Sequence, residues 1–422
     1  MLARGIYTAL LYALLPFIPL RLLWRARKQP EYLQHIAERF GHYRELPTQP
    51  VIWLHAVSVG ETRAAAPLVA LLRERLPQYQ ILLTHMTPTG RATSQQLWGD
   101  EVLRCYLPYD YPFAVNGFLD HFQPRLGILL ETELWPNLVA LCAQRNIPVA
   151  LINARLSRRS ARGYARFGAL MKGTLEKLAL IAAQTDVDGE RLSTLFSGQV
   201  SIMGNLKFDN VVPAEQVALG EKLRAGFGAN RPVWLAASTR DGEELLLLDV
   251  LEKIQTPNAL AVIVPRHPQR FNEVAELLKA RKIPFQRRSD NAAINPNTKV
   301  VLGDSMGEMF AYFASSDVAF IGGSLLPLGG QNLIEACAVG TPVLIGPHTF
   351  NFAEATQQAI AAGAALRVTD HVALAAELNR LLADGPRRSA MSAAGLAFTA
   401  QHRGASERAY AALVSLLPDR AP

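Results

Sequence analysis

The chain is poor in cysteine, and its few cysteines are not spaced for chemistry. Its 422 residues include three, Cys105, Cys142 and Cys337, which stand far apart in apolar segments. None belongs to a Cys-x-x-Cys pair, which excludes the redox and zinc motifs built on that spacing. We expect all three to be reduced core residues in a reducing compartment.

Several nucleotide and nucleic-acid signatures are also missing. No Gly-x-Gly-x-x-Gly follows a predicted strand and there is no Walker loop, so a dinucleotide or ATP site lacks its usual sequence. Lysine and arginine are not interleaved with aromatics, and no zinc-finger, RNP or KH signature occurs, which argues against a nucleic-acid partner. The formal charge of +7 and the pI of about 9.4 therefore favour an acidic membrane surface or a phosphorylated substrate.

The N-terminal segment, residues 1–30, predicts a membrane anchor. Residues 5–20 carry no charge, and a basic flank follows at Arg21, Arg25, Arg27 and Lys28. Crossing a bilayer takes about 20 apolar residues, a length that is reached when Leu22–Trp24 are included. No small-x-small cleavage site follows, which argues against a signal peptide. The basic flank predicts a cytoplasmic main body, and a buried core helix is the alternative. Residues 30–44 fit an amphipathic interfacial helix or an ordinary helix of the first domain.

From residue 51 onwards, short apolar runs alternate with helical patterns, as in βαβ units with parallel sheets. The predicted strands are 51–57, 80–86, 102–107, 125–130, 148–153, 179–183 and 200–203, then 233–237, 259–264, 299–302, 318–321, 342–345 and 364–368. Strand periodicity stops near Asp209–Ala214. We therefore expect two doubly wound Rossmann-like domains, residues 31–210 and 211–422, with ligands in the cleft between them.

The segment that ends the first strand carries the first candidate for chemistry. Glu61 follows a turn containing Ser58 and Gly60 and opens a helix. A carboxylate there is favoured by the helix dipole, so it fits a helix cap and a general base about equally. Its position at a strand's carboxyl end raises the second interpretation, although the dipole should lower its basicity.

Two further strand ends of the first half carry charge. A buried strand runs directly into Glu131 and Glu133, of which one should cap the next helix and the other point into the cleft. Arg155 and Lys207 follow two later strands, where a cation suits a phosphate or carboxylate. The ordinary alternative for each is a solvated surface charge.

The second half repeats this arrangement with basic and glycine-rich turns. Arg266 and His267 follow a strand between two prolines, as a phosphate leaving group would require. Two glycine-rich turns follow, at 303–309 and 322–335. Glycines permit close approach of a ligand, and Glu335 lies one turn into the next helix, where it would accept ribose hydroxyls. Asp186 and Asp188 have the spacing of a metal-bound sugar-nucleotide site, but helix capping explains them better.

Together these segments resemble the bacterial 3-deoxy-D-manno-octulosonic acid (Kdo) transferases of lipopolysaccharide synthesis. The similarity covers nearly the whole chain, including the N-terminal anchor. It is carried by His55–Thr62, 86–90, 107–110, Glu131–Asn137, Asn153–Ser157, Gly204–Asp209, Pro265–Pro268 and Gly322–Glu335. Gln331 and Leu333 depart from the pattern, because many members carry His and Pro there.

The resemblance implies a GT-B fold and inverting transfer of Kdo from CMP-Kdo to a tetra-acylated, bis-phosphorylated lipid A precursor, lipid IVA. It implies an enzyme anchored in the inner membrane with its catalytic domains on the cytoplasmic side, and neither a metal nor another cofactor. The family's base falls on Glu61 and its supporting residues on Glu131 and Lys207. Ser58 and Arg155 are candidate acceptor contacts. The implied CMP contacts are Arg266, His267, Gly307, Glu308, Met309, Asn332, Leu333, Ile334 and Glu335.

Two other functions fit the same architecture. A sugar-nucleotide epimerase would have no membrane acceptor, against which the N-terminal anchor argues. A catalytically silent membrane-bound nucleotide- or lipid-binding protein would tolerate the loss of Glu61 and Glu131, whereas the enzyme would not.

Overall fold

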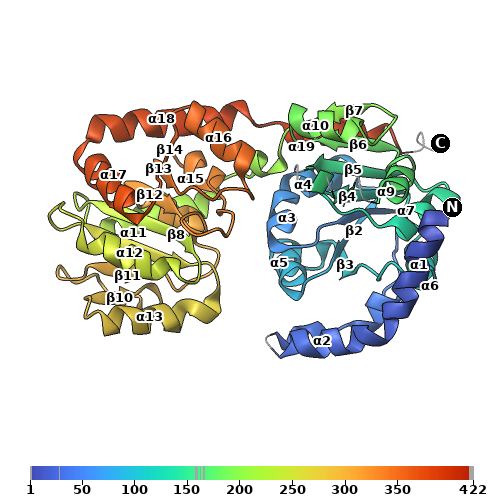
Figure 1. Cartoon of the computed structure of the whole chain (residues 1–422), viewed down its shortest axis with the longest axis horizontal. Helices are drawn as coiled ribbons and strands as arrows, with labels where there is room; N and C mark the ends of the chain where they lie inside the picture. Colours follow the sequence, from blue (N-terminus) through green and yellow to red (C-terminus); the bar gives the residue numbers. More distant parts are fainter. Residues whose placement is uncertain (1, 28, 157–159, 162, 165–166, 418–422) are drawn as a thin grey trace. The chain divides into compact units, whose positions relative to one another are not determined.

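The computed structural model describes residues 2–27, 29–156, 160–161, 163–164 and 167–417, which form two compact units (Figure 1). The first unit runs to Asn210 and resumes at His402, and the second is Val211–Gln401. Two residues of the predicted motifs, Lys28 and Ser157, lie outside the described residues.

The first unit is built on a parallel seven-stranded sheet. Its strand order is β3-β2-β1-β4-β5-β6-β7. Every residue of β1 and β4 is buried, because helices cover both faces of a parallel sheet. The strands are β1 Val51–His55, β2 Gln80–His85, β3 Leu103–Tyr106, β4 Leu126–Leu130, β5 Val149–Ala154, β6 Leu180–Ala183 and β7 Val200–Ile202. The helices are α3 Val59–Ala64, α4 Ala66–Arg75, α5 Pro88–Trp98, η4 Gly99–Glu101, α6 Pro112–Phe122, α7 Pro136–Gln144, α9 Gly168–Leu175, α10 Asp186–Ser193, η5 Leu206–Asp209 and α19 Ala405–Val414.

The N-terminal helix lies against this unit. It consists of α1 Leu2–Leu14, a 3-10 turn η1 Leu15–Phe17 at Pro16, and α2 Ile18–Ala26. Within the described residues it is the one stretch that is long and apolar enough to cross a membrane. The core-helix alternative is wrong, because 6% of its most apolar window is buried. Its polar groups nevertheless contact the domain: the Tyr7 hydroxyl donates to Asp110 Oδ2 at 3.0 Å, and Tyr111 donates to the carbonyl of Leu11 at 2.8 Å.

The second unit repeats the architecture with strand order β10-β11-β9-β8-β12-β13-β14, all parallel. Its strands are β8 Val233–Thr239, β9 Leu260–Pro265, β10 Phe285–Arg287, β11 Val300–Leu302, β12 Val318–Ile321, β13 Val343–Ile345 and β14 Ala365–Arg367. Its helices are α11 Ala214–Phe227, α12 Glu243–Glu252, η6 Pro268–Arg270, α13 Phe271–Ala280, η7 Arg288–Asp290, α14 Met309–Ala314, α15 Ile334–Ala338, α16 Ala353–Ala361, α17 His371–Ala383 and α18 Gly385–Gln401.

The C-terminal helix departs from the boundary predicted for the second domain. Residues from His402 onwards belong to the first unit, where Ala405, Ala409 and Leu413 of α19 enter its core. The carboxylate of Asp209 accepts hydrogen bonds from the backbone N–H groups of Gly404 at 2.6 Å and Ser406 at 2.5 Å, and so caps α19. In the sequence, the second unit is therefore an insertion between two segments of the first.

Two local predictions also need correction. Residues 30–44 form no long helix but two 3-10 turns, η2 Pro30–Leu33 and η3 Ile36–Phe40, separated by His35 in the left-handed conformation with φ 53°. The edge strand β10 was not predicted, because its three half-buried residues show no apolar run. The three cysteines are free and buried, as expected.

Candidate active site

The turn after β1 holds Glu61 by its carboxylate. The Ser58 hydroxyl caps α3 by accepting from the N–H of Glu61 at 3.5 Å, and it donates to Glu61 Oε1 at 3.1 Å. Glu61 Oε2 accepts from the N–H of Val57 at 2.8 Å. The two bonds to the Glu61 side chain, from the N–H of Val57 and the hydroxyl of the cap residue Ser58, turn the carboxylate back over the strand end. The same arrangement therefore caps the N-terminus of α3 and holds the Glu61 carboxylate at the edge of the sheet.

The environment of Glu61 makes it a stronger base than an exposed carboxylate. Burial, together with the charges of Glu131 and Glu133, raises the pKa of Glu61 from 4.5 to about 7, against the opposing bonds from Val57 and Ser58. The sequence-based expectation that the helix dipole would lower its basicity is thus wrong, because desolvation and like charges outweigh it.

The like charges come from the neighbouring strand. β4 pairs with β1, so the residues that follow β4 lie beside Glu61. Glu131 adopts the left-handed conformation with φ 57°. Its Oε1 forms an ion pair with Lys207 Nζ at 2.9 Å. Glu133 Oε2 lies 3.9 Å from the buried Nε2 of His55. Burial raises the pKa of Glu133 and lowers that of His55 to about 3, which leaves His55 neutral.

Arg155 joins the same group of residues. It follows β5, the neighbour of β4, and its backbone N–H donates to the carbonyl of Glu131 at 3.4 Å. Five sequence-predicted residues of the first unit therefore gather at one sheet edge: Ser58, Glu61, Glu131, Arg155 and Lys207.

Sequence analysis assigned no role to the residues that hold this edge in place, although Thr87 and Asn153 lie in segments that carry the resemblance. Thr87 Oγ1 donates to the carbonyl of Val57 at 3.0 Å, and His85 Nδ1 lies 2.8 Å from the carbonyl of Ala56, so β2 fixes the loop that binds Glu61. Asn153 Oδ1 accepts from the N–H of Leu206 at 3.1 Å and so fixes the residue before Lys207. Polar residues at the ends of apolar strands were the available signal.

In the second unit, the predicted basic turn follows β9. The N–H of Arg266 donates to the carbonyl of Thr239, at the end of β8, at 3.0 Å. Partial burial and the charges of Arg240, Arg266 and Arg270 lower the pKa of His267, so it is neutral near pH 7. Arg240, at the end of β8, is a cation that the sequence analysis missed.

The turn after β11 is held by its own side chains. Glu308 accepts from Ser305 Oγ at 2.6 Å and from Arg288 Nη2 at 3.2 Å. Gly307 adopts φ 81°, and a side chain built on it would meet open space. Because the carboxylate of Glu308 is engaged, residues 307–309 present mainly backbone to a ligand.

The glycine turn after β12 depends on a buried carboxylate. Glu243 is fully buried and accepts from the N–H groups of Arg240, Gly323 and Leu325 at 3.0, 2.5 and 3.0 Å. Gly322 packs so closely against Ser238 that an added Cβ would lie 2.6 Å from its carbonyl oxygen. Sequence analysis missed Glu243, which shapes this turn.

The predicted nucleotide stretch continues into α15. Asn332 accepts from the N–H of Ile334 at 3.1 Å and donates to Glu335 Oε1 at 3.1 Å. The side chains of Leu333 and Ile334 are buried, so these two positions face a ligand only through their backbone. The carboxyl ends of β11, β9, β8 and β12 are adjacent in the sheet, which brings the predicted residues of this unit to one edge.

The possible metal motif of the first unit is occupied by structural bonds. Asp188 accepts from Thr185 Oγ1 at 2.8 Å and from the N–H of Leu156 at 2.9 Å, as the capping interpretation predicts. No group of three or more His, Cys, Asp or Glu side chains that could hold a metal ion occurs among the described residues.

Comparison with known proteins identifies the family. Residues 34–210 match the family model described as 3-deoxy-D-manno-octulosonic-acid transferase (kdotransferase), and residues 245–397 match that of glycosyl transferases group 1. The chain is 44% identical to a 3-deoxy-D-manno-octulosonic acid transferase of Bordetella pertussis, over 98% of this chain and 99% of the relative. The chain belongs to the Kdo transferase family. A relative of the same name from Haemophilus influenzae is 41% identical over 96% of both chains.

Solved structures show the fold of this Kdo transferase to be GT-B. A glycosyltransferase from Rickettsia africae aligns with a TM-score of 0.58 at 15% identity, over 88% of this chain and 100% of that one. A UDP-GlcNAc 2-epimerase from Neisseria meningitidis aligns with a TM-score of 0.57 at 18% identity, over 87% and 99%. The fold is thus common to both enzyme classes, and it is the sequence relatives that make this chain a glycosyltransferase rather than an epimerase or a silent binding protein.

Proposed function

We propose that this Kdo transferase moves Kdo from CMP-Kdo to a tetra-acylated, bis-phosphorylated lipid A precursor, with inversion at the anomeric carbon. The observation that supports it best is Glu61, a half-buried carboxylate of raised pKa beside the Glu131–Lys207 ion pair. A base whose pKa lies near the working pH is ionised in a large fraction of the molecules and still binds a proton strongly enough to remove it from the acceptor.

The first unit supplies the base in this mechanism. Glu61 takes the proton of the acceptor's primary sugar hydroxyl. The hydroxyl oxygen then attacks the anomeric carbon of Kdo from the face opposite the phosphate. The bond from that carbon to the CMP phosphate oxygen breaks, and CMP leaves as a phosphate monoester. Lys207 offsets the charge that develops, while Glu131 holds the ammonium at 2.9 Å. Ser58 positions the base, and Arg155 contacts the acceptor.

The second unit binds the donor in this proposal. Arg266 and neutral His267 provide a cation and a hydrogen-bond donor for the phosphate, beside Arg240. Backbone groups of Gly307, Glu308 and Met309 bind the cytosine ring of CMP. Asn332 and Glu335 receive the ribose, with Leu333 and Ile334 contributing their backbone. No metal takes part in this scheme.

The test uses purified protein, CMP-Kdo and lipid IVA. Mass spectrometry should show Kdo added to the lipid, NMR should show an inverted anomeric centre, and CMP should appear only when lipid is present. Glu61→Gln should abolish transfer while CMP still binds. Near-normal turnover by that variant, or CMP release without lipid, contradicts the proposal.

Membrane attachment follows from the N-terminal helix, which we place at the cytoplasmic face of the inner membrane. Large exposed apolar side chains recur every three or four residues along one side of it: Leu2, Ile6, Leu10, Leu14, Phe17, Leu20 and Trp24. The opposite side holds Tyr7 and Thr8, which bond to the domain at Asp110 and Asn137. A crossing helix would carry these domain residues into the bilayer, at a cost of about 3 kcal/mol for an aspartate at its centre.

We therefore propose that the helix lies in the membrane interface with its apolar side inserted. A cysteine placed at Arg4, one turn before Thr8 and therefore on the side opposite the inserted residues, should react with an impermeant maleimide from the cytoplasmic side only; the three native cysteines are buried. Labelling from the periplasmic side would show a crossing helix instead.

A further inference from the structure

A cavity of about 260 Å³ lies under α2, next to the loop that holds Glu61. Arg21 and Arg25 of α2, Arg39 of η3, and Trp135 line it. Val57, whose N–H binds Glu61, lines it as well. The cavity therefore adjoins the proposed base and lies beneath the helix that we place at the membrane.

Arg39 is a buried cation without a counterion. It is 1% exposed, and its guanidinium lies 3.8 Å from the centre of the Tyr106 ring. Both terminal nitrogens reach the carbonyl of Met86 at a long 3.4 Å, and Nε has no hydrogen-bond partner. No ion pair to Arg39 forms within the described ranges. Removing such a charge from water without a partner is costly, so the geometry calls for an anion.

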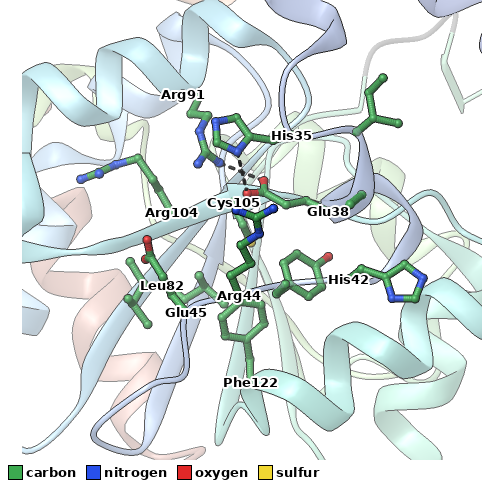
Figure 2. Close-up of a pocket in the computed structure, with 14 residues that line it drawn as sticks. His35, Glu38, His42, Arg44, Glu45, Leu82, Arg91, Arg104, Cys105 and Phe122 are labelled. Carbon is green, nitrogen blue, oxygen red and sulfur yellow. Dashed lines mark hydrogen bonds and ion pairs between the residues drawn. The ribbon is translucent and has the colours of Figure 1, made fainter.

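Arg91, by contrast, is an arginine of the same unit that has a counterion, and that counterion is Glu38, the residue before Arg39. Figure 2 shows a separate cavity at the edge strand β3, where Glu38 accepts from Arg91 at 3.0 Å and approaches His35 at 3.3 Å. Glu38 and Arg39 are consecutive, yet Glu38 pairs with Arg91 and leaves Arg39 unpaired. The missing anion is therefore not supplied by the nearest carboxylate.

The rest of the lining is also basic. Arg25 donates to the Tyr32 hydroxyl at 3.4 Å, and neither Arg25 nor Arg21 forms an ion pair with any described residue. Glu133, the one carboxylate of the lining, lies against His55 instead. Three guanidinium groups against one carboxylate favour a dianion, and arginine binds phosphate by two parallel hydrogen bonds.

We propose that Arg39, Arg21 and Arg25 bind a phosphate monoester of the lipid acceptor and so place its sugar hydroxyl at Glu61. The proposal rests on the proposed lipid acceptor. It identifies the part of that acceptor that the first unit recognises and the residues that do so.

The experiment compares three acceptors in detergent micelles: the bis-phosphorylated lipid, and two forms of the same lipid that each lack one of the two phosphates. Arg21→Gln, Arg25→Gln and Arg39→Met should each lower kcat/KM for the bis-phosphorylated lipid at least tenfold and leave the KM for CMP-Kdo unchanged. The loss should shrink to less than about threefold on the lipid that lacks the bound phosphate, because the variant then loses no partner. Arg39→Lys should recover part of the activity.

Arg27→Gln is the matched control, because Arg27 is exposed, follows directly on α2, and lies outside this cavity. It should act as wild type on all three lipids. If Arg39→Met does not fold, the test depends on Arg21→Gln and Arg25→Gln, the two variants on α2. Equal losses on all acceptors, no loss, or a raised KM for CMP-Kdo would overturn the proposal.

A free-phosphate arm separates the two sources of this chemistry. Inorganic phosphate should compete with the lipid in the wild type and compete less in Arg21→Gln. Phosphate inhibition combined with indifference to the acceptor's own phosphates would mean a free-anion site and overturn the lipid assignment. A wild type that transfers no Kdo would instead refute the proposed function itself.

Discussion

Replacing the proposed base should make the protein more stable. Glu61→Gln keeps the carbonyl oxygen that accepts from Val57, and its amide can donate to the Ser58 hydroxyl, so both side-chain contacts of this position survive. What disappears is a carboxylate that burial, Glu131 and Glu133 all oppose in its charged form. The variant removes this electrostatic cost together with the activity.

The magnitude follows from the pKa of Glu61, which the fold raises from 4.5 to about 7. Below pH 4.5 the carboxyl is protonated in both the folded and unfolded chain, so wild type and variant should be equally stable. As the pH rises to 7, only the unfolded chain ionises freely, and the wild type loses stability. Because a tenfold change in proton affinity corresponds to about 1.4 kcal/mol, this rise in the pKa predicts a gain of about 3 kcal/mol for the variant at pH 8 and less than about 1 kcal/mol at pH 5.

The assay is denaturant unfolding of the detergent-solubilised protein at both pH values, followed by tryptophan fluorescence. Trp234 of β8 is the one tryptophan of the second unit, whereas Trp24, Trp53, Trp98 and Trp135 belong to the first, so replacing Trp234 by phenylalanine leaves a signal from the first unit alone. The gain should be confined to the transition of the first unit.

The control is Glu190→Gln, an exposed glutamate on α10 of the same unit, which should leave stability and activity unchanged. A Glu61→Gln protein that is no more stable than wild type at pH 8, or whose gain is the same at pH 5, would refute the electrostatic reasoning. Retained transfer would refute the role of Glu61 as well.

Three further predictions concern the pH profile and the donor turn. In the wild type, kcat/KM should fall tenfold per pH unit below about pH 7, as Glu61 becomes protonated; a flat profile to pH 5 would contradict this. Glu131→Gln should move that acid limb to lower pH while reducing kcat, because its charge helps to raise the pKa of Glu61; a limb that stays in place would show that burial alone sets the pKa. Glu243→Gln should destabilise the second unit by about 2 kcal/mol and raise the KM for CMP-Kdo, since an amide oxygen accepts fewer of the three N–H groups; calorimetric titration with CMP measures the effect.

Much of the fold could be predicted because its determinants are local in the sequence. Strands such as Val51–His55 and Leu126–Leu130 are uninterrupted apolar runs, which is what burial on both faces of a parallel sheet requires. Charged residues directly after such runs then mark the sheet edge. Glu61, Glu131 and Lys207 came from this rule, and the structure brings them to the same edge of the first unit.

The remainder depends on contacts between distant segments. Burial in the folded unit, together with the charge of Glu131 70 positions away, raises the pKa of Glu61, so helix position alone predicted the wrong direction. Glu243 begins an unremarkable helical pattern, and its role appears only when β12 lies beside β8. Arg39 lies in a stretch whose periodicity suggests one helix, which the left-handed His35 breaks into two turns.

The return of α19 to the first unit dictates an order of events on the ribosome. The core of the first unit includes Ala405, Ala409 and Leu413, which are synthesised after the whole of Val211–Gln401, the continuous stretch that forms the second unit. The second unit can therefore complete its fold while the first still exposes an open apolar groove for α19. Here the usual N-to-C order of domain folding is reversed, because the half that carries the proposed base becomes whole only after the entire second unit has been synthesised.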